Sequence, residues 1–357
     1  MKIFSIVIVY GTAFPSCQRP VAKTVHIRPY FLYFWRMQSF EELSKKFSAH
    51  FDRSHFPEQP ASLYEPNNYF LSLGGKRFRP VLCLMANELL GEIHPDAWHV
   101  ATAIELFHNF TLIHDDIMDK APLRRGQPTV HSKYNEPTAI LAGDVMLVKA
   151  YDYINKLSPE FIPRILGLFN KTATEVCEGQ QYDMDFELRD NVSYEEYLHM
   201  ITLKTSVLLA ASLQMGGILG GGSLGNLALL YEAGKKIGLA FQMQDDYLDA
   251  FGDPEKFGKQ PGGDILSNKK TFLLIQALEV ANAAQKQELQ ELLNGNAADK
   301  VARVLQLYRD CKIDEWAIAQ KDLFLNDALD YIEEIAVLAK RKKPLKDLAL
   351  LLVKRDY

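Results

Sequence analysis

The sequence has few cysteines, no long uncharged apolar segment and no excess of basic residues. Its four cysteines are far apart and form no C-x-x-C pair, which argues against a disulfide framework or a zinc site and favours the cytoplasm. The longest apolar run near the start, residues 4–14, is too short to span a bilayer, so we expect no stable membrane anchor. The formal net charge of −5 speaks against a nucleic-acid partner.

The first 36 residues differ from the rest of the chain. An apolar run after a basic residue imitates a signal peptide, but a proline and basic residues follow it without a small-residue cleavage site. Helical patterning begins only after Met37, where Ser39 and Glu42 have the spacing of a capping box. We therefore expect residues 1–36 to be a non-native or disordered extension, with translation starting at Met37 and one domain over residues 37–357.

Most of the chain has the apolar spacing of helices. From Ser39 onward apolar residues recur at intervals of three and four, and alternating, strand-like runs are scarce. Residues 207–222 are apolar on every side, which predicts a helix at the centre of a bundle, and the glycines of residues 216–222 predict a loop or break. No change in composition marks a second domain. The sequence predicts an all-α protein, a single large helical bundle around a deep central cavity.

Two acidic clusters of identical form indicate metal sites. Asp115 and Asp119 lie one helical turn apart on one face, with Asp116 beside them, and residues 245–249 repeat this arrangement. Like charges in apolar surroundings require a counter-charge, and carboxylates without His or Cys favour Mg²⁺. One such cluster could equally be a solvated acidic face, but two of the same form favour metal binding.

Basic residues near these clusters suit diphosphates. Residues 74–80 place three cations between a Gly-Gly pair and a proline that can open a helix. Arg124 and Arg125 follow the first acidic cluster, where guanidinium groups can bind phosphate oxygens bidentately. His108 lies two turns before Asp115 and could donate to a second diphosphate, although taken alone it would be interpreted as a core histidine. The combination predicts a site for two diphosphates, that is, for prenyl transfer.

The sequence closely resembles the trans-isoprenyl diphosphate synthase family, the polyprenyl synthetases, from about residue 40 to the C-terminus. The specificity of the resemblance comes from many motifs in the family's order. They lie at residues 74–80, 114–119, 124–129, 178–180, 204–205, 241–249, 257–259, 263–265 and 268–271.

The resemblance implies an isoprenoid synthase fold, a homodimer and a reaction. In that reaction isopentenyl diphosphate condenses head-to-tail with an allylic diphosphate (dimethylallyl, geranyl or farnesyl) and pyrophosphate is released. The family pattern implies roughly three Mg²⁺ ions per site, with Asp115, Asp119 and Asp245 as direct ligands assisted by Asp116, Asp246 and Asp249. Lys76, Arg79, His108 and Arg125 match positions that hold isopentenyl diphosphate, whereas Arg124, Lys204, Thr205, Gln242, Lys259 and Lys269 match positions that serve the allylic substrate.

The residues before the first acidic cluster bear on product length. Thr111 lies one turn before Asp115, with Phe110 beside it and Phe107 a further turn away, so a growing tail would meet two aromatic rings. Short-chain members of the family carry bulk here, and some farnesyl enzymes have aromatics at both positions equivalent to Phe110 and Thr111. We therefore expect geranylgeranyl diphosphate as product, with farnesyl diphosphate as the alternative; the rings could also be ordinary core residues.

Two other classes of protein share parts of this pattern. A class I terpene cyclase would carry an Asn/Ser/Glu-type second metal motif and would not need the cations of residues 74–80. A non-catalytic subunit of a heteromeric synthase commonly loses aspartates from a motif, whereas all six are present here. Both are less favoured than the synthase.

Overall fold

The first described helix begins where the sequence predicts it. The computed structural model describes residues 37–52, 54–253, 262–295 and 297–353. The Ser39 hydroxyl accepts a hydrogen bond from the Glu42 backbone N–H at 3.2 Å, and the Glu42 carboxylate accepts one from the Ser39 N–H at 2.8 Å. The capping box is thereby confirmed. The predicted extension of residues 1–36, and Lys259, lie outside the described residues.

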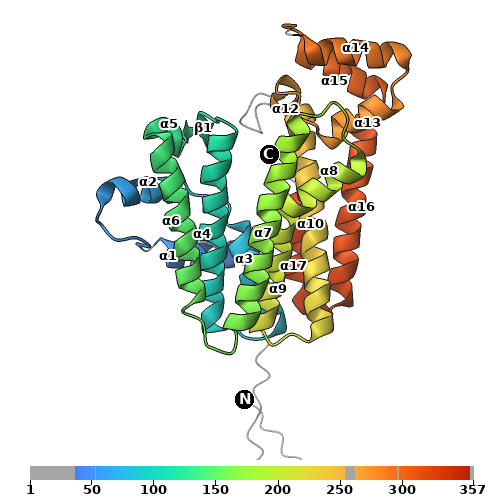
Figure 1. The fold of residues 1–357 in the computed structure, drawn as a ribbon. Helices are drawn as coiled ribbons and strands as arrows, with labels where there is room; N and C mark the ends of the chain where they lie inside the picture. Colours follow the sequence, from blue (N-terminus) through green and yellow to red (C-terminus); the bar gives the residue numbers. More distant parts are fainter. Residues whose placement is uncertain (1–36, 53, 254–261, 296, 354–357) are drawn as a thin grey trace, which may run out of the picture. The chain divides into compact units, whose positions relative to one another are not determined.

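The described residues form a helical bundle with one short hairpin, which confirms the predicted fold class (Figure 1). The hairpin pairs β1 (Leu123–Arg124) with β2 (Gln127–Pro128). The helices are α1 (Phe40–Phe51), α2 (Ala61–Ser72), α3 (Phe78–Leu90), α4 (Pro95–Met118), α5 (Val130–Lys133), α6 (Glu136–Ile154), α7 (Ile162–Glu187), α8 (Tyr194–Ile201), the π-helix η1 (Thr202–Ser206), α9 (Val207–Leu219), α10 (Leu224–Phe251), α12 (Gly263–Leu266), α13 (Phe272–Val280), α14 (Ala283–Asn294), α15 (Lys300–Asp310), α16 (Ile313–Glu334) and α17 (Ala339–Val353).

Helix α9 lies at the centre of the bundle, as its uniformly apolar sequence predicts. It packs against α3, α7 and α10, and nearly all of its side chains are buried. The segment Tyr194–Leu219 is long and apolar enough to cross a membrane, but 78% of its most apolar window is buried inside the protein. Other helices supply the apolar partner that this segment requires.

The predicted break at residues 216–222 is wrong in part, because α9 continues to Leu219. A Cβ added at Gly216 would lie 2.0 Å from the backbone oxygen of Cys83 on α3. The glycine therefore permits two helices to approach closely instead of ending one of them. Only from Gly220 does the chain turn.

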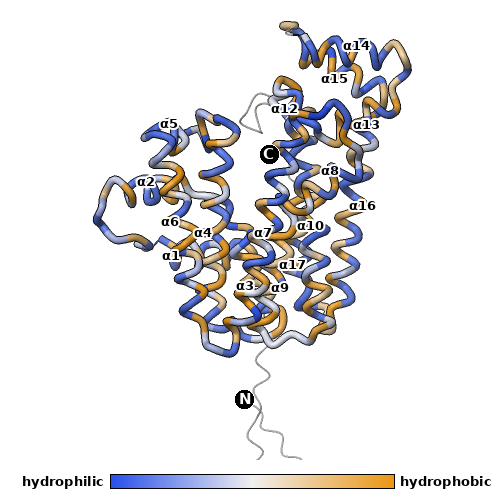
Figure 2. Tube along the Cα trace, in the orientation of Figure 1, coloured by the Kyte–Doolittle hydropathy of each residue, from blue (hydrophilic) through white to orange (hydrophobic). Residues whose placement is uncertain are grey.

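The outer helices expose one face to solvent. Apolar and polar residues are interleaved along outer helices such as α6 and α16 (Figure 2), the pattern of helices that bury one side. One apolar cluster joins α1, α3, α4, α9 and α17, and a second joins α8, α13, α15 and α16. The two acidic motifs lie near the C-terminal ends of α4 and α10, and both of these ends point toward the same end of the bundle (Figure 1).

Candidate active site

A cavity of about 690 Å³ opens between α3, α4, α7, η1, α9 and α10. It brings together most of the residues that the sequence predicts. Those that line it are Arg79, His108, Phe110, Thr111, Asp115, Asp119, Lys204, Thr205, Gln242, Asp245 and Lys269.

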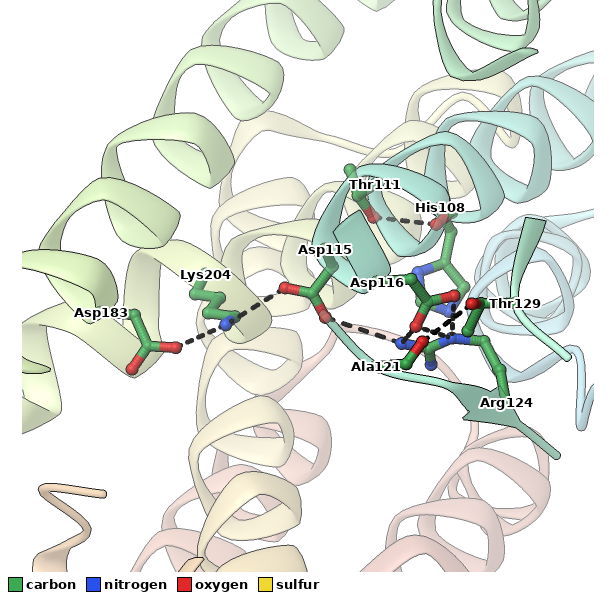
Figure 3. A network of polar contacts seen from close by, with 9 residues as sticks. All are labelled: His108, Thr111, Asp115, Asp116, Ala121, Arg124, Thr129, Asp183 and Lys204. Atoms are coloured by element: carbon green, nitrogen blue, oxygen red, sulfur yellow. Dashed lines mark hydrogen bonds and ion pairs between the residues drawn. The ribbon is translucent and has the colours of Figure 1, made fainter. Parts of the chain in front are cut away.

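A chain of alternating charges runs beside this cavity, from Asp183 on α7 to Asp116 on α4 (Figure 3). Lys204 Nζ lies 2.6 Å from Asp183 Oδ2 and 3.4 Å from Asp115 Oδ1. On the other side of the first acidic motif, Arg124 Nε donates to both carboxylate oxygens of Asp116, at 2.8 and 2.9 Å. Arg124 Nη2 is also 3.7 Å from Asp115 Oδ2. Cations thus flank the first acidic motif on both sides.

Lys204 and Thr205 lie on a π-helical segment, η1, which the sequence did not predict. Helix α7 packs tightly on this segment, since a Cβ at Gly179 would lie 2.2 Å from the backbone N of Lys204. A π-helical insertion changes the direction in which its side chains point and is frequent at functional sites. Here it sends the Lys204 ammonium toward the first acidic motif.

The second acidic motif is held differently from the first. Asp245 lines the cavity, whereas Asp246 is buried and accepts hydrogen bonds from Tyr197 Oη at 2.7 Å and Gln242 Nε2 at 2.9 Å. Gln242 accepts in turn from Thr205 Oγ1 at 3.0 Å. Burial raises the pKa of Asp246, and these hydrogen bonds act in the opposite direction. Side-chain hydrogen bonds therefore hold Asp246 in the core, whereas Asp245 lies at the cavity.

Asp249 faces the segment that follows α10. Its Oδ2 accepts a hydrogen bond from the backbone N–H of Asp264 at 2.9 Å. Burial raises the pKa of Asp264 to about 7, and the Asp246 and Asp249 carboxylates add to this effect. Lys269 lies among these groups: burial would lower its pKa, but Asp264, Asp183, Asp246 and Asp119 together hold that pKa above the ordinary value. Lys269 therefore links the two acidic motifs electrostatically.

The three cations of residues 74–80 lie in different environments. Arg79 Nη1 lies 3.1 Å from His108 Nε2, and both line the cavity. Because arginine only donates, Nε2 is the acceptor, so the neutral His108 carries its proton on Nδ1. Burial and then Arg79 hold the pKa of His108 well below its usual value. Arg77 instead points away from the cavity and pairs with the buried Glu105, while Lys76 is exposed.

The hairpin places Arg124 at the end of β1 and Arg125 in the turn that follows. Arg125 and Gly126 both have positive φ, 53° and 74°, as a two-residue type I′ turn requires. Arg124 points back to Asp116, and the Arg125 guanidinium donates to the backbone oxygen of Gly74. The side chain of Arg125 therefore links the hairpin to the loop that precedes α3.

The aromatic residues on α4 form two layers. Phe110 and Thr111 line the cavity. Phe107, predicted to meet the tail directly, is only 1% exposed and is not on the cavity wall. Its ring lies 5.6 Å from that of Phe110 and 5.2 Å from that of Phe169 on α7. Phe107 therefore packs against Phe110 on the side away from the cavity.

The carboxylates of the cavity fit a hard divalent cation whose coordination a bound diphosphate would complete. Asp115 Oδ1 is buried and accepts no hydrogen bond from the described part of the chain, and Asp119 and Asp245 line the same cavity. Burial and the Asp115 carboxylate raise the pKa of Asp119, a penalty that a cation would relieve. Within the described residues no three His, Cys, Asp or Glu side chains already converge on one point. Oxygens from a substrate would therefore have to join these carboxylates.

Sequence reasoning missed two residues that the structure places in this network, and it gave no role to a third, Asp264, although that residue lies in the matched motif at residues 263–265. Asp183 binds Lys204, Tyr197 donates to Asp246, and Asp264 contacts Asp249. For Asp183 a signal was present: it lies one helical turn after Gly179 and Gln180, on the same face of α7.

The fold and the cavity define a class of protein, a helical bundle with two acidic motifs and a separate cationic pair around one cavity. The family model described as polyprenyl synthetase matches residues 60–311, and the chain belongs to this family of trans-prenyltransferases. Enzymes of this family are Mg²⁺-dependent and use isopentenyl and allylic diphosphates.

Relatives from archaea place the chain with the short-chain members of the family. It is 42% identical over 261 residues to the short chain isoprenyl diphosphate synthase of Methanothermobacter thermautotrophicus, covering 73% of this chain and 80% of that protein. It is 45% identical over 223 residues to the geranylgeranyl diphosphate synthase of Methanosarcina mazei, covering 62% and 69%. The fold matches a crystal structure of geranylgeranyl pyrophosphate synthase with a TM-score of 0.84 and 43% identity, over 89% of this chain and 99% of that one.

Proposed function

We propose that the protein condenses isopentenyl diphosphate with allylic diphosphates and makes geranylgeranyl diphosphate as its main product. The observation that carries this proposal is that one cavity collects both acidic motifs and, beside them, the Arg79–His108 pair. A cavity that holds a single diphosphate would need either the acidic motifs or the cationic pair, but not both. The presence of both supports a reaction between two diphosphate substrates.

We infer that Asp115, Asp119 and Asp245 hold Mg²⁺ directly, with roughly three ions per site. Asp116 is occupied by Arg124, Asp246 by Tyr197 and Gln242, and Asp249 by the Asp264 backbone, which supports assisting roles for these three. When bound, the metal neutralises charge on the diphosphate oxygens.

The protein's own cations serve the leaving group of the allylic substrate. Lys204 and Lys269 line the cavity at the acidic motifs, and Arg124 lies beside Asp115. As the allylic C–O bond breaks, negative charge develops on the leaving diphosphate, and these fixed cations stabilise it. Phe110, Leu208 and Phe241 supply apolar surface around the carbon chain, which keeps water from the allylic cation.

The second substrate is assigned to the cationic pair. Arg79 and the Nδ1–H of His108 donate to the diphosphate of isopentenyl diphosphate. Lys76, on the loop before α3, and Arg125, on the hairpin, lie nearby. The isopentenyl double bond then attacks the allylic cation, which forms the new C–C bond. A proton leaves the adjacent carbon, and the released pyrophosphate is the base that accepts it.

The product assignment rests on the wall of the cavity and on the relatives. Thr111 is small and Phe110 is the aromatic residue of α4 that lines the cavity, so one ring of this helix limits the tail. Two aromatic rings at these positions would favour farnesyl diphosphate, which remains the alternative product. The names of the Methanosarcina mazei relative and of the matching crystal structure support geranylgeranyl diphosphate.

We further propose a cytoplasmic homodimer. Helix α6 exposes an apolar stripe, with Leu141 at 56% and Val148 at 60% of their surfaces, seven residues apart on one face. Such a stripe is suited to a second copy of the chain. The cytoplasm is supported by the free cysteines among the described residues, Cys83, Cys177 and Cys311.

Release of pyrophosphate distinguishes the candidate functions. The purified chain is given Mg²⁺ with an allylic diphosphate alone, isopentenyl diphosphate alone, or both. We expect release only with both substrates. Release from the allylic substrate alone would indicate a cyclase, and no release under any condition would indicate a non-catalytic subunit.

A further inference from the structure

A buried ion pair lies directly behind the cationic pair of the cavity. Arg77, at the start of α3, donates to Glu105 on α4, and their side chains are only 6% and 3% exposed. The Arg77 guanidinium also lies 4.7 Å from the centre of the Phe51 ring on α1. Neither residue lines the cavity, and the proposed reaction uses neither of them directly.

The backbone at Arg77 is held in an unfavourable conformation. Arg77 is the N-cap of α3, with φ 55° and ψ 30°, a left-handed conformation that residues other than glycine seldom adopt. Gly74 and Gly75 before it also have positive φ, 76° and 155°. The ion pair holds one side of this loop, and on the other side Arg125 donates to the Gly74 oxygen.

The ion pair and the cationic pair are neighbouring links between the same two elements. Arg77 and Arg79 are two residues apart at the start of α3, and their partners Glu105 and His108 are three apart on α4. Asn109 Nδ2 donates to Glu105 Oε1 at 3.1 Å and so fixes the carboxylate. The two arginines are therefore linked to neighbouring positions of α4.

Glu105 also acts on the other arginines of this region. Burial lowers the pKa of Arg79 to about 10, and the Glu105 carboxylate works against that effect. It does the same for Arg125, whose pKa burial also lowers. One buried carboxylate thus lets several guanidinium groups stay charged close together.

We propose that the Arg77–Glu105 ion pair positions the isopentenyl diphosphate subsite, by fixing the loop that carries Lys76 and the start of α3 that carries Arg79, without touching the substrate. This inference rests on the proposed function, which assigns the Arg79–His108 pair to isopentenyl diphosphate. Losing the pair would weaken binding of that substrate and leave the allylic subsite intact.

The test replaces the pair by apolar residues of similar size, R77M/E105L, so that neither member is left as a buried charge without the other. Binding of isopentenyl diphosphate alone is measured by calorimetry, and KM for each substrate by initial rates. We expect the Kd and KM for isopentenyl diphosphate to rise about tenfold, because a displaced guanidinium loses its hydrogen-bond geometry. The KM for the allylic diphosphate should stay within about twofold.

Two further variants make the result interpretable. R77K keeps the charge but loses the planar guanidinium, so we expect a smaller rise of about threefold in the same Kd; this variant decides the question if the double variant does not fold. The control K236M/D327L removes another ion pair, between α10 and α16, and should leave both KM values unchanged.

The outcomes separate the inference from the function on which it rests. If the wild-type chain binds no isopentenyl diphosphate, the proposed function fails. If the wild type binds it and the variants at Arg77 and Glu105 bind equally well, the positioning role is wrong. An equal rise in both KM values would mean that the pair stabilises the whole protein and positions neither substrate in particular.

Discussion

Phe110 separates the cavity from a second aromatic layer formed by Phe107 and Phe169. Replacing Phe110 by alanine should let the prenyl tail extend toward that layer, so we expect products at least one isoprene unit longer than those of the wild type. Chromatography of the dephosphorylated products measures the change. If F110A leaves the product length as it was, Phe110 is not the floor.

Phe107 provides the matched control. It is buried behind Phe110 and does not line the cavity, so F107A should destabilise the protein by about 3–5 kcal/mol with no change in the main product. Denaturant unfolding and the same chromatography measure both effects. A longer product from F107A alone would show that the tail reaches this ring in the wild type.

Asp183 determines how Lys204 is shared between two carboxylates. Without the charge of Asp183, the Lys204 ammonium would move toward Asp115 and compete with the metal there. We expect D183N to lower kcat by about 10²-fold and to leave the thermal midpoint nearly unchanged. The control D185N changes an exposed carboxylate of the same helix that accepts from Gln181, and it should retain wild-type kcat.

At the scale of single residues, the motifs were sufficient to predict which side chains come together. Eleven of the predicted residues line one cavity, and Arg124 lies beside it. Asp183 and Tyr197 were missed, and Asp264 was given no role within its motif, because each acts by contacting another site residue, a relation that appears only after folding. Arg77 shows the opposite limit: three cations in one motif do not reveal which of them points into the core.

The packing of α3 on α9 depends on Gly216. An alanine there would place its Cβ against the Cys83 carbonyl oxygen, so we expect G216A to lower the free energy of unfolding by about 2 kcal/mol, despite the better helix propensity of alanine. Gly167 is the matched control, since a Cβ there meets nothing within 4 Å. G167A should raise the free energy of unfolding by about 0.5–1 kcal/mol. Equal effects of the two variants would contradict the close approach of α3 and α9.

At the scale of elements, the start of the first described helix was predictable and local irregularities were not. The capping box at Ser39 is encoded by residues three apart and was confirmed. The π-helical segment η1 arises where α7 packs on it at Gly179, a contact between segments that are distant in sequence. The same reason explains why the glycines of α9 were interpreted as a break when they permit close packing.

The whole protein should fold without metal. Lys204, Lys269 and Arg124 already compensate the acidic motifs, so removal of Mg²⁺ by EDTA should stop turnover and shift the thermal midpoint by less than about 2 °C. Mg²⁺ together with pyrophosphate should then raise the midpoint, because the bound state is the folded one. Unfolding on chelation would mean that the metal is structural.

The apolar stripe on α6 makes a prediction about assembly. Glutamate in place of Leu141 should dissociate the proposed homodimer, since a charge would be buried between two copies of the chain. Light scattering coupled to size-exclusion chromatography measures the mass. L338E, at another exposed leucine that lies between α16 and α17, serves as control and should remain dimeric. A dimer that survives L141E would place the interface elsewhere.

At the scale of the whole molecule, the fold class and the family were predictable because the motifs recur in order along the chain, and both were confirmed. Product length was less accessible, since it depends on how α4 and α7 close the cavity around Phe110. The most direct measurement is therefore a product analysis with Mg²⁺, labelled isopentenyl diphosphate and each allylic starter in turn, followed by chromatography of the dephosphorylated alcohols. Geranylgeraniol as the main alcohol is the predicted result. Farnesol as the end product would contradict the product assignment, and no labelled alcohol from any starter would contradict the proposed condensation itself.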